Sequence, residues 1–402
     1  MKLTPKFEAQ LLESATLAGK WHIDNQNNEK HPWGGVHSSA DNGRFLYEYF
    51  PATGSGHGGV VWTQATAIMG LLTMFHGLRY VGWEFREPAI LAGEYLKTLQ
   101  ILDKGKETNY GAFRETTPQT SYGYPRDAAT GGMGLIALYR ETGEEDYLQR
   151  AMIFAEWYHR YGSNEKGWPH YQFIFKTGKG GKPSPETPDA DWQGGGALVY
   201  YWLYKLTGDK KWFGYFMQIV AILMEFHAHA QVDDMYSLGK TQVSSGNDDF
   251  SIAVLMSAYR ETKDKKILAT VQKHVRRLWT LMDEDGSYPG YAGTFVSNFN
   301  NVEYLQLCRE ENIQEDIPAL EARILKTIKF GLTLQELSPR DIRSHGGFYG
   351  QSVFGVSRRQ IHARDTSYSI ILHMRVVGGT ETPYYSAWHW DNVKIPKPAN
   401  PA

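Results

Sequence analysis

The sequence predicts an all-α fold in which about six pairs of helices form a ring. Two observations predict it. A short charged turn recurs between two stretches with helical periodicity, and a loop rich in Gly and aromatic residues recurs before the first stretch of each pair. Repetition on this scale is typical of proteins in which each unit buries its apolar face against the next.

The recurring turn is clearest at residues 140–147, 205–212 and 260–267, which read RETGEEDY, KLTGDKKW and RETKDKKI. Apolar residues at helical spacing precede and follow each turn, which predicts a helix on both sides. Gly143 and Gly208 suit the left-handed residue that ends many helices. A short turn between two helices makes them antiparallel, so each unit is predicted to be a helical hairpin.

The first helices of the pairs are expected to begin near residues 62, 128, 193, 247, 298 and 363. The second helices are expected over residues 84–102, 144–162, 209–229, 264–283 and 317–335, with residues 5–20 as the outer helix that closes the set. The first helices carry fewer charges and therefore form the inner layer. Few segments show a strand pattern. Residues 36–57 could hold another short helix, which leaves seven pairs open. No linker divides the chain, so we expect a single domain over residues 1–402.

Composition limits the function classes. Hydrophobic residues make up 42% and charged residues 21% of the 402 residues, as in ordinary globular proteins. The formal net charge of −2 gives no reason to expect nucleic acid or an anionic membrane as a partner. No apolar run is long enough to span a bilayer. The first 21 residues do not have the pattern of a signal peptide, so we expect a periplasmic or secreted protein if such a peptide was removed, and a cytoplasmic one otherwise.

Aromatic residues make up 14% of the chain, with 25 Tyr and 12 Trp, and many lie beside Gly, His, Asn and Arg in predicted loops. Sugar rings have an apolar C–H face and a polar rim, which such a mixture can bind. The HExxH, paired CxxC, phosphate-loop and EF-hand patterns are absent. We therefore expect a carbohydrate substrate, no cofactor and no metal. The oligomeric state is left open.

In a ring of this kind the inner helices begin at one end, so their first residues and the preceding loops meet there. A glycoside hydrolase needs two carboxyl groups on either side of the scissile bond. The candidates are Asp127, Asp191, Asp248, Asp249, Glu303 and Asp365. A polysaccharide lyase needs groups that neutralise a uronate carboxylate, together with a base and an acid. Arg, His and Tyr gather for this purpose at residues 358–368 and 122–126.

The helical ring, together with the segments HPWGGVHSSADNGRFLYEYF and FYGQSVFGVSRRQIHARDTSYS, resembles the (α/α)-barrel polysaccharide lyases, most closely polysaccharide lyase family 38. The resemblance implies cleavage of a 1,4-linked polyuronate, alginate- or glucuronan-like, by β-elimination. The expected substrate is thus an acidic polysaccharide or oligosaccharide.

Roles can be assigned to particular residues under this hypothesis. Tyr291 or Tyr124 would transfer the proton, and Asn247 with His362 would neutralise the carboxylate. The predicted substrate-binding residues are Arg126, Arg364, Arg358, Trp33, Trp62, Trp192, His37, Arg44, Tyr288 and Tyr349. Among them the tryptophans would stack on sugar rings.

Other functions fit the same fold. One is a glycoside hydrolase that uses a pair of Asp or Glu carboxylates, for which the consecutive Asp248 and Asp249 are suggestive. Another is a sugar 2-epimerase, and a third is a glycan-binding ring without activity.

Overall fold

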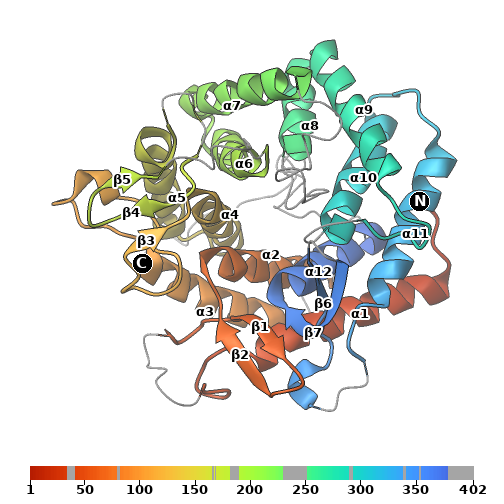
Figure 1. Cartoon of the computed structure of the whole chain (residues 1–402), viewed down its shortest axis with the longest axis horizontal. Helices are drawn as coiled ribbons and strands as arrows, with labels where there is room; N and C mark the ends of the chain where they lie inside the picture. Colours follow the sequence, from red (N-terminus) through yellow and green to blue (C-terminus); the bar gives the residue numbers. More distant parts are fainter. Residues whose placement is uncertain are drawn as a thin grey trace, which may run out of the picture.

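The computed structural model describes residues 1–33, 41–78, 82–164, 167, 169–181, 190–229, 251–288, 293–337, 341–352 and 355–378. Within these residues the chain forms a ring of two concentric layers of helices (Figure 1). The inner layer consists of α2 (Val61–Gly77), α4 (Pro125–Thr142), α6 (Ala190–Thr207), α8 (Ser251–Thr262), α10 (Gly293–Glu310) and α12 (Ala363–Gly378). The outer layer consists of α1 (Pro5–Asp24), α3 (Trp83–Leu99), α5 (Glu145–Trp157), α7 (Lys210–His229), α9 (Lys265–Thr280) and α11 (Ile317–Leu332).

The helices alternate between the two layers along the chain, and this confirms the predicted all-α toroid. The ring closes where α12 packs against α1, α2 and α10. Ser367 of α12 and His22 of α1 are hydrogen-bonded there, with 3.0 Å between the hydroxyl and the ring nitrogen. The described residues contain six pairs. A seventh is not seen in 41–57, which hold strands β1 (Leu46–Phe50) and β2 (Ser55–Gly58) in place of a helix.

Burial explains the difference in composition between the layers. All residues of α2 from Val61 to Phe75 are buried, because other helices surround it. Helix α9 lies at the surface and buries only one stripe, which includes Ile267, Val271 and Leu278. An inner helix therefore carries mostly apolar or small residues on every side, with a few buried polar ones, whereas an outer helix needs apolar residues on one face only.

The predicted turns end the inner helices as expected. Gly143 follows α4 with φ 73°, and its N–H bonds the carbonyl of Tyr139. Gly208 follows α6 with φ 69°, and Lys263 follows α8 with φ 56°. A left-handed residue at these points lets the chain reverse directly into the next outer helix.

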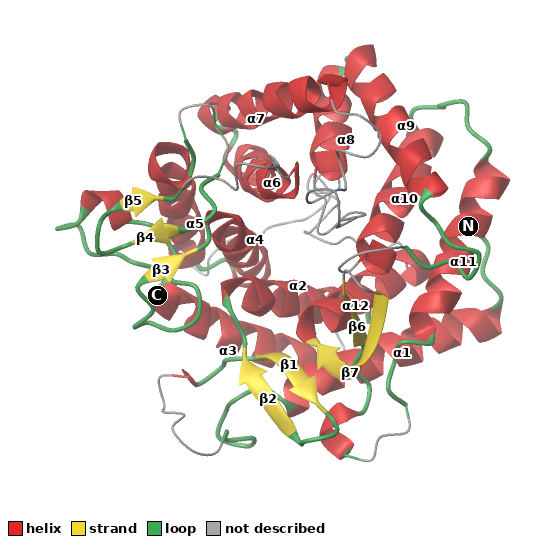
Figure 2. Ribbon diagram, viewed as in Figure 1, coloured by secondary structure: helices red, strands yellow, loops and turns green. Residues whose placement is uncertain are grey.

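Strands that the sequence did not predict lie at the end of the ring where the inner helices begin (Figure 2). One sheet has the order β2-β1-β7-β6, with β6 (Tyr349–Ser352) and β7 (Gly355–His362) immediately before α12. A second sheet has the order β3-β4-β5, formed by β3 (Tyr122–Gly123), β4 (Phe173–Ile174) and β5 (Lys179–Gly180). Both sheets belong to the loops that precede inner helices, so they form the rim of this end.

Among the described residues, no helix combines the length and the apolar character that crossing a membrane requires.

Candidate active site

Three inner helices bring an indole and two guanidinium groups together. Trp62 lies in the first turn of α2, Arg126 in that of α4 and Arg364 in that of α12. The Arg126 guanidinium carbon is 5.2 Å from the centre of the Trp62 ring, and that of Arg364 is 5.6 Å away. All three are among the substrate-binding residues predicted from the sequence, and the fold places them side by side although they are far apart in the chain.

Trp62 is only 5% exposed, and its indole N–H has no hydrogen-bond partner among the described residues. A buried donor of this kind is unfavourable unless a ligand or a water molecule accepts from it. The start of α2 is therefore suited to bind an oxygen of a ligand.

Glu115 and Asp127 form a carboxyl pair next to this indole. Glu115 is 3% exposed and hydrogen-bonds the side chain of Asp127 in the first turn of α4. The backbone N–H of Tyr124 donates to the second Glu115 oxygen at 3.3 Å. Burial, together with the negative charge of Asp127, raises the pKa of Glu115 well above its ordinary value. Two carboxylates in contact do not both ionise readily, so this pair holds a proton to higher pH than a separate carboxyl group would.

The backbone fixes the position of the pair. The N–H of Val61, at the start of α2, donates to the Glu115 carbonyl at 2.8 Å, and the Glu115 N–H donates to the carbonyl of Tyr122 at 3.1 Å. Asp127 keeps a side-chain exposure of 15%, so it is the more accessible member of the pair.

Each arginine near Trp62 has a carboxylate beside it. Arg126 contacts Asp127 at 3.1 Å, and Arg364 contacts Asp365 at 3.4 Å. The two aspartates thus balance the charges of the two arginines, and Glu115 adds no positive charge. The described part of the site therefore has no surplus of positive charge with which to select an acidic ligand.

His362 ends β7 and precedes Arg364 by two residues. Its Nδ1 accepts the backbone N–H of Arg364 at 3.1 Å, and its ring contacts Tyr47 edge to face at 4.6 Å between ring centres. Burial and the charge of Arg364 hold the pKa of His362 well below its ordinary value. The ring is therefore neutral, and since Nδ1 is an acceptor, the proton is on Nε2. In this state His362 donates a hydrogen bond and does not act as a base.

Tyr124 directly precedes α4 and contacts Tyr122 and Tyr171 edge to face. Its pKa is raised, because burial and the neighbouring Tyr171, Tyr122, Glu115 and Asp127 all disfavour the phenolate. The predicted role of Tyr124 as a base required a lowered pKa, so the surroundings of this residue argue against that role.

Other predicted residues lie away from Trp62. Tyr288 is buried against Leu278 and accepts from the amide of Asn301 at 3.1 Å, an arrangement that packs α9 against α10. The buried Arg44 donates to the Gly59 carbonyl at 3.0 Å and pairs with Asp41 at 3.2 Å. These contacts indicate that Tyr288 and Arg44 stabilise the fold.

The sheet β2-β1-β7-β6 separates two further groups. Tyr47 and His362 contact each other on one face, whereas Leu46, Ile361 and Tyr349 belong to an apolar cluster against which Trp33 packs. The exposed Arg358 lies over the Tyr349 ring at 5.8 Å. Trp33, Tyr349 and Arg358 are therefore not brought together with Trp62.

Three predicted residues, Tyr291, Asn247 and His37, lie outside the described residues, as do Asp248 and Asp249. Trp192 lies in the first turn of α6, where only the backbone is described.

Sequence reasoning missed Glu115. Glu115 lies in a loop between α3 and α4 and belongs to no motif. The nearest signal was a charged residue in a segment of Thr, Tyr and Gly, which is typical of any exposed loop. The described residues hold no cluster of three or more His, Cys, Asp or Glu side chains that could bind a metal ion.

No protein-family model matches the chain, and no curated protein matches it. Solved structures do. The cellobiose 2-epimerase from Bacillus thermoamylovorans has a TM-score of 0.69 at 14% identity, and the match covers 92% of this chain and 100% of that chain. A family 76 glycoside hydrolase from a bovine Bacteroides thetaiotaomicron strain has a TM-score of 0.66 at 13% identity, covering 91% of this chain and 77% of that chain.

A third similar structure is an inactive variant of the α-1,6-mannanase of a Salegentibacter species, in complex with α-1,6-mannotriose, in which two consecutive aspartates are replaced by asparagine. Its TM-score is 0.59 at 13% identity, and the match covers 92% of this chain and 100% of that chain. At such identities the likeness establishes the (α/α)-barrel fold alone.

These comparisons correct the assignment made from the sequence. The resemblance to polysaccharide lyase family 38 is wrong, because the similar structures are family 76 hydrolases and sugar epimerases. The predictions of a lyase, of β-elimination and of an alginate or glucuronan substrate depended on this resemblance and are wrong as well. The error arose because Arg, His and Tyr at helix starts on this fold are not specific to one chemistry.

Proposed function

We propose that the chain is a glycoside hydrolase that cleaves a neutral oligosaccharide at the end of the ring where the inner helices begin. The observation that carries this proposal is the carboxyl pair of Glu115 and Asp127, in which burial and the charge of Asp127 raise the pKa of Glu115. Glycoside hydrolysis needs a carboxylic acid that is still protonated at the working pH, so that it can protonate the leaving oxygen.

The proton of the pair is on Glu115, which would pass it across their hydrogen bond to Asp127 as Asp127 donates a proton to the leaving oxygen. Asp127 would be the group that contacts the substrate, because it is the more accessible member of the pair. The pair cannot supply both catalytic groups. Its members are hydrogen-bonded to each other, whereas hydrolases hold their two carboxyl groups about 5–9.5 Å apart.

A second carboxylate must therefore come from another segment. Asp248 and Asp249 precede α8 by three and two residues in the sequence. The mannanase made inactive by replacing two consecutive aspartates supports the choice of this pair. One of the two would act as the base or nucleophile that complements Asp127.

A neutral substrate follows from the balance of charges around Trp62. The arginines hold their own carboxylates, and the Nε2–H of His362 remains a donor for a sugar hydroxyl. The earlier expectation of an acidic substrate has no support in these contacts.

The first substrates to test are α-1,6-mannotriose and α-1,6-mannotetraose, with cellobiose and maltotriose beside them. New reducing ends, measured by chromatography, are the expected result. A product with inverted C2 and no cleavage, measured by NMR, would mean a 2-epimerase and would refute the hydrolase.

The variant Asp127→Asn should lower the rate by about 100-fold to 10,000-fold, the usual contribution of a general acid. The control is Glu84→Gln at the exposed start of α3, which should keep the full rate. Full activity in Asp127→Asn would remove this residue from the mechanism.

A further inference from the structure

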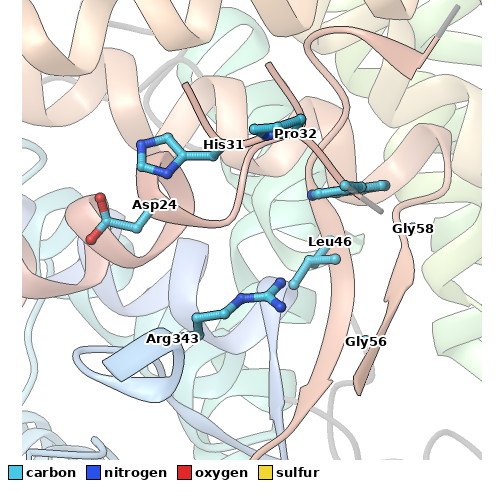
Figure 3. Close-up of a pocket in the computed structure, with 8 residues that line it drawn as sticks. Asp24, His31, Pro32, Leu46, Gly56, Gly58 and Arg343 are labelled. Atoms are coloured by element: carbon cyan, nitrogen blue, oxygen red, sulfur yellow. The ribbon is translucent and has the colours of Figure 1, made fainter. Parts of the chain in front are cut away.

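A separate hollow lies on the other face of the sheet β2-β1-β7-β6. Its volume is about 390 Å³, and Asp24, His31, Trp33, Leu46 and Arg343 contribute to its lining. Figure 3 shows Asp24, His31 and Arg343 around an open space, with Leu46 on the strand beside it. The volume lies within the range of small-molecule sites and suits about one or two sugar rings.

This pocket is distinct from the site at Trp62. A β-bulge in β1 between Leu46 and Glu48 interrupts the regular alternation of side chains, so the contacts of each residue assign it to a face. Tyr47 contacts His362 on one face, whereas Leu46 packs with Trp21 and Trp33 on the other. A ligand beside Leu46 is thus separated by the sheet from the inner helix starts.

The pocket has a fixed aromatic platform. Trp33 is half-buried, and its indole N–H donates to the carbonyl of Asn25 at 3.2 Å. Its backbone N–H donates to the side-chain oxygen of Asn27 at 2.9 Å. The ring is therefore held before any ligand arrives, which lowers the entropic cost of binding.

A fixed donor accompanies this platform. The Arg343 guanidinium lies over the Tyr49 ring at 5.0 Å, and its Nε donates to the side-chain oxygen of Asn25 at 3.3 Å. The exposed guanidinium can donate further hydrogen bonds towards the pocket.

Asp24 supplies the acceptor, and its position is unusual. It is the last residue of α1, where the helix carries a partial negative charge, so a carboxylate there is unfavourable for the helix. Among the described residues, no ion pair or hydrogen bond to its exposed side chain compensates for this. A carboxylate at the end of a helix, where the helix itself does not stabilise it, is suited to bind a ligand.

We propose that this pocket is an accessory binding site for a neutral sugar, separate from the catalytic site. Asp24 would accept from sugar hydroxyls, Arg343 would donate to them, and Trp33 would contact the apolar face of the ring. The opposite charges of Asp24 and Arg343 favour a neutral ligand. The choice of a sugar rests on the proposed function, but the pocket is tested by binding alone.

The test is calorimetric titration of the full chain carrying Asp127→Asn, which slows turnover, with α-1,6-mannotriose, cellobiose and maltotriose in turn. Two binding sites per chain are expected for at least one of these sugars. Adding Asp24→Asn should weaken one of the two sites about tenfold or more, the effect of losing a charge-assisted hydrogen bond, and leave the other unchanged.

Trp33→Ala should remove the same site. Since Trp33 also packs in the apolar cluster, Asp24→Asn is the decisive variant: its thermal midpoint should be unchanged or higher, because the replaced carboxylate opposes the helix dipole. The matched control is Trp83→Ala with Glu84→Gln, an exposed pair at the start of α3. It should keep both sites.

The outcomes separate the two proposals. A single site for all three sugars, or two sites that Asp24→Asn leaves unchanged, overturns the accessory site even if the wild type cleaves its substrate. Two sites that respond as expected, in a chain whose wild type cleaves nothing, support the accessory site and contradict the proposed hydrolase.

Discussion

Replacing Glu115 by Gln should remove one specific pH dependence of stability. The pKa of Glu115 is raised in the folded chain by burial and by Asp127, so the folded state binds its proton more tightly than the unfolded state does. The stabilisation from this group is complete below the ordinary carboxyl pKa of 4.5 and is lost as the pH rises towards the raised pKa.

Within that window one proton changes the free energy of unfolding by about 1.4 kcal/mol per pH unit. The unfolding entropy of a chain of 402 residues is about 0.8 kcal/mol/K, from about 2.1 cal/mol/K per residue. The two values together predict a shift of about 2 °C in the thermal midpoint per pH unit.

Gln is a suitable replacement because its amide can still donate to Asp127 and accept from the Tyr124 N–H, as the protonated Glu does. Thermal midpoints of wild type and Glu115→Gln should be measured between about pH 5 and pH 8. As the pH rises, the thermal midpoint of the wild type should fall relative to that of Glu115→Gln by about 2 °C per pH unit. The difference should become constant above the raised pKa of Glu115.

Glu84→Gln serves as the exposed control, and its curve should run parallel to the wild type. Parallel curves for Glu115→Gln as well would refute the shared proton. The rate of hydrolysis gives a second measurement. Glu115 acts on the substrate only through Asp127, so Glu115→Gln should shift the alkaline limb of the pH–rate profile.

Further predictions concern stability and can be read from the thermal midpoint. His22 and His373 are buried, and burial lowers the pKa of each to about 3. Each should therefore lower the free energy of unfolding by about 2 kcal/mol when the pH falls from 6.5 to 5. Replacing either residue with Gln or Leu should make the thermal midpoint fall less steeply with pH in this range, and an unchanged slope would contradict burial of a neutral ring. The side chain of Gln335 is hydrogen-bonded to the hydroxyl and the carbonyl of Ser14 in α1 and to the carbonyl of Gly346. Gln335→Leu should lower the free energy of unfolding by about 2–4 kcal/mol. A loss below about 1 kcal/mol would mean that water replaces these hydrogen bonds. Arg375 and Glu303 form an ion pair at 3.3 Å, and both side chains are 2% exposed. Arg375→Met should lower the free energy of unfolding by about 3–5 kcal/mol, because it leaves a buried charge without its partner, and adding Glu303→Gln should restore part of this loss. No recovery in the double variant would argue against the pair.

Much of the fold could be predicted because its signals are local. A helix depends on residues three and four positions apart, and its end depends on one residue such as Gly143 or Gly208. The sheet β3-β4-β5 was missed because each of its strands is two residues long, too short to show an alternating pattern. They form only because their partner segments are held in place by helices.

The candidate site was predicted in part. Trp62, Arg126 and Arg364 were found because each lies at the start of an inner helix, and the repeat shows that such starts converge. Trp33 and Tyr349 were assigned to the same site for the same reason. The sheet places them on its other face, which the spacing of helices does not reveal.

The sequence by itself determined the order of helices, the layer to which each belongs and the end of the ring at which chemistry-bearing residues gather. These properties follow from periodicity and charge within a few neighbouring residues. Only the tertiary structure decided that Glu115 is hydrogen-bonded to Asp127, that Nδ1 of His362 accepts from the backbone of Arg364 and that burial raises the pKa of Tyr124. Each of these depends on burial and on partners from other segments, because a pKa responds to the surroundings in space and not to those in the chain.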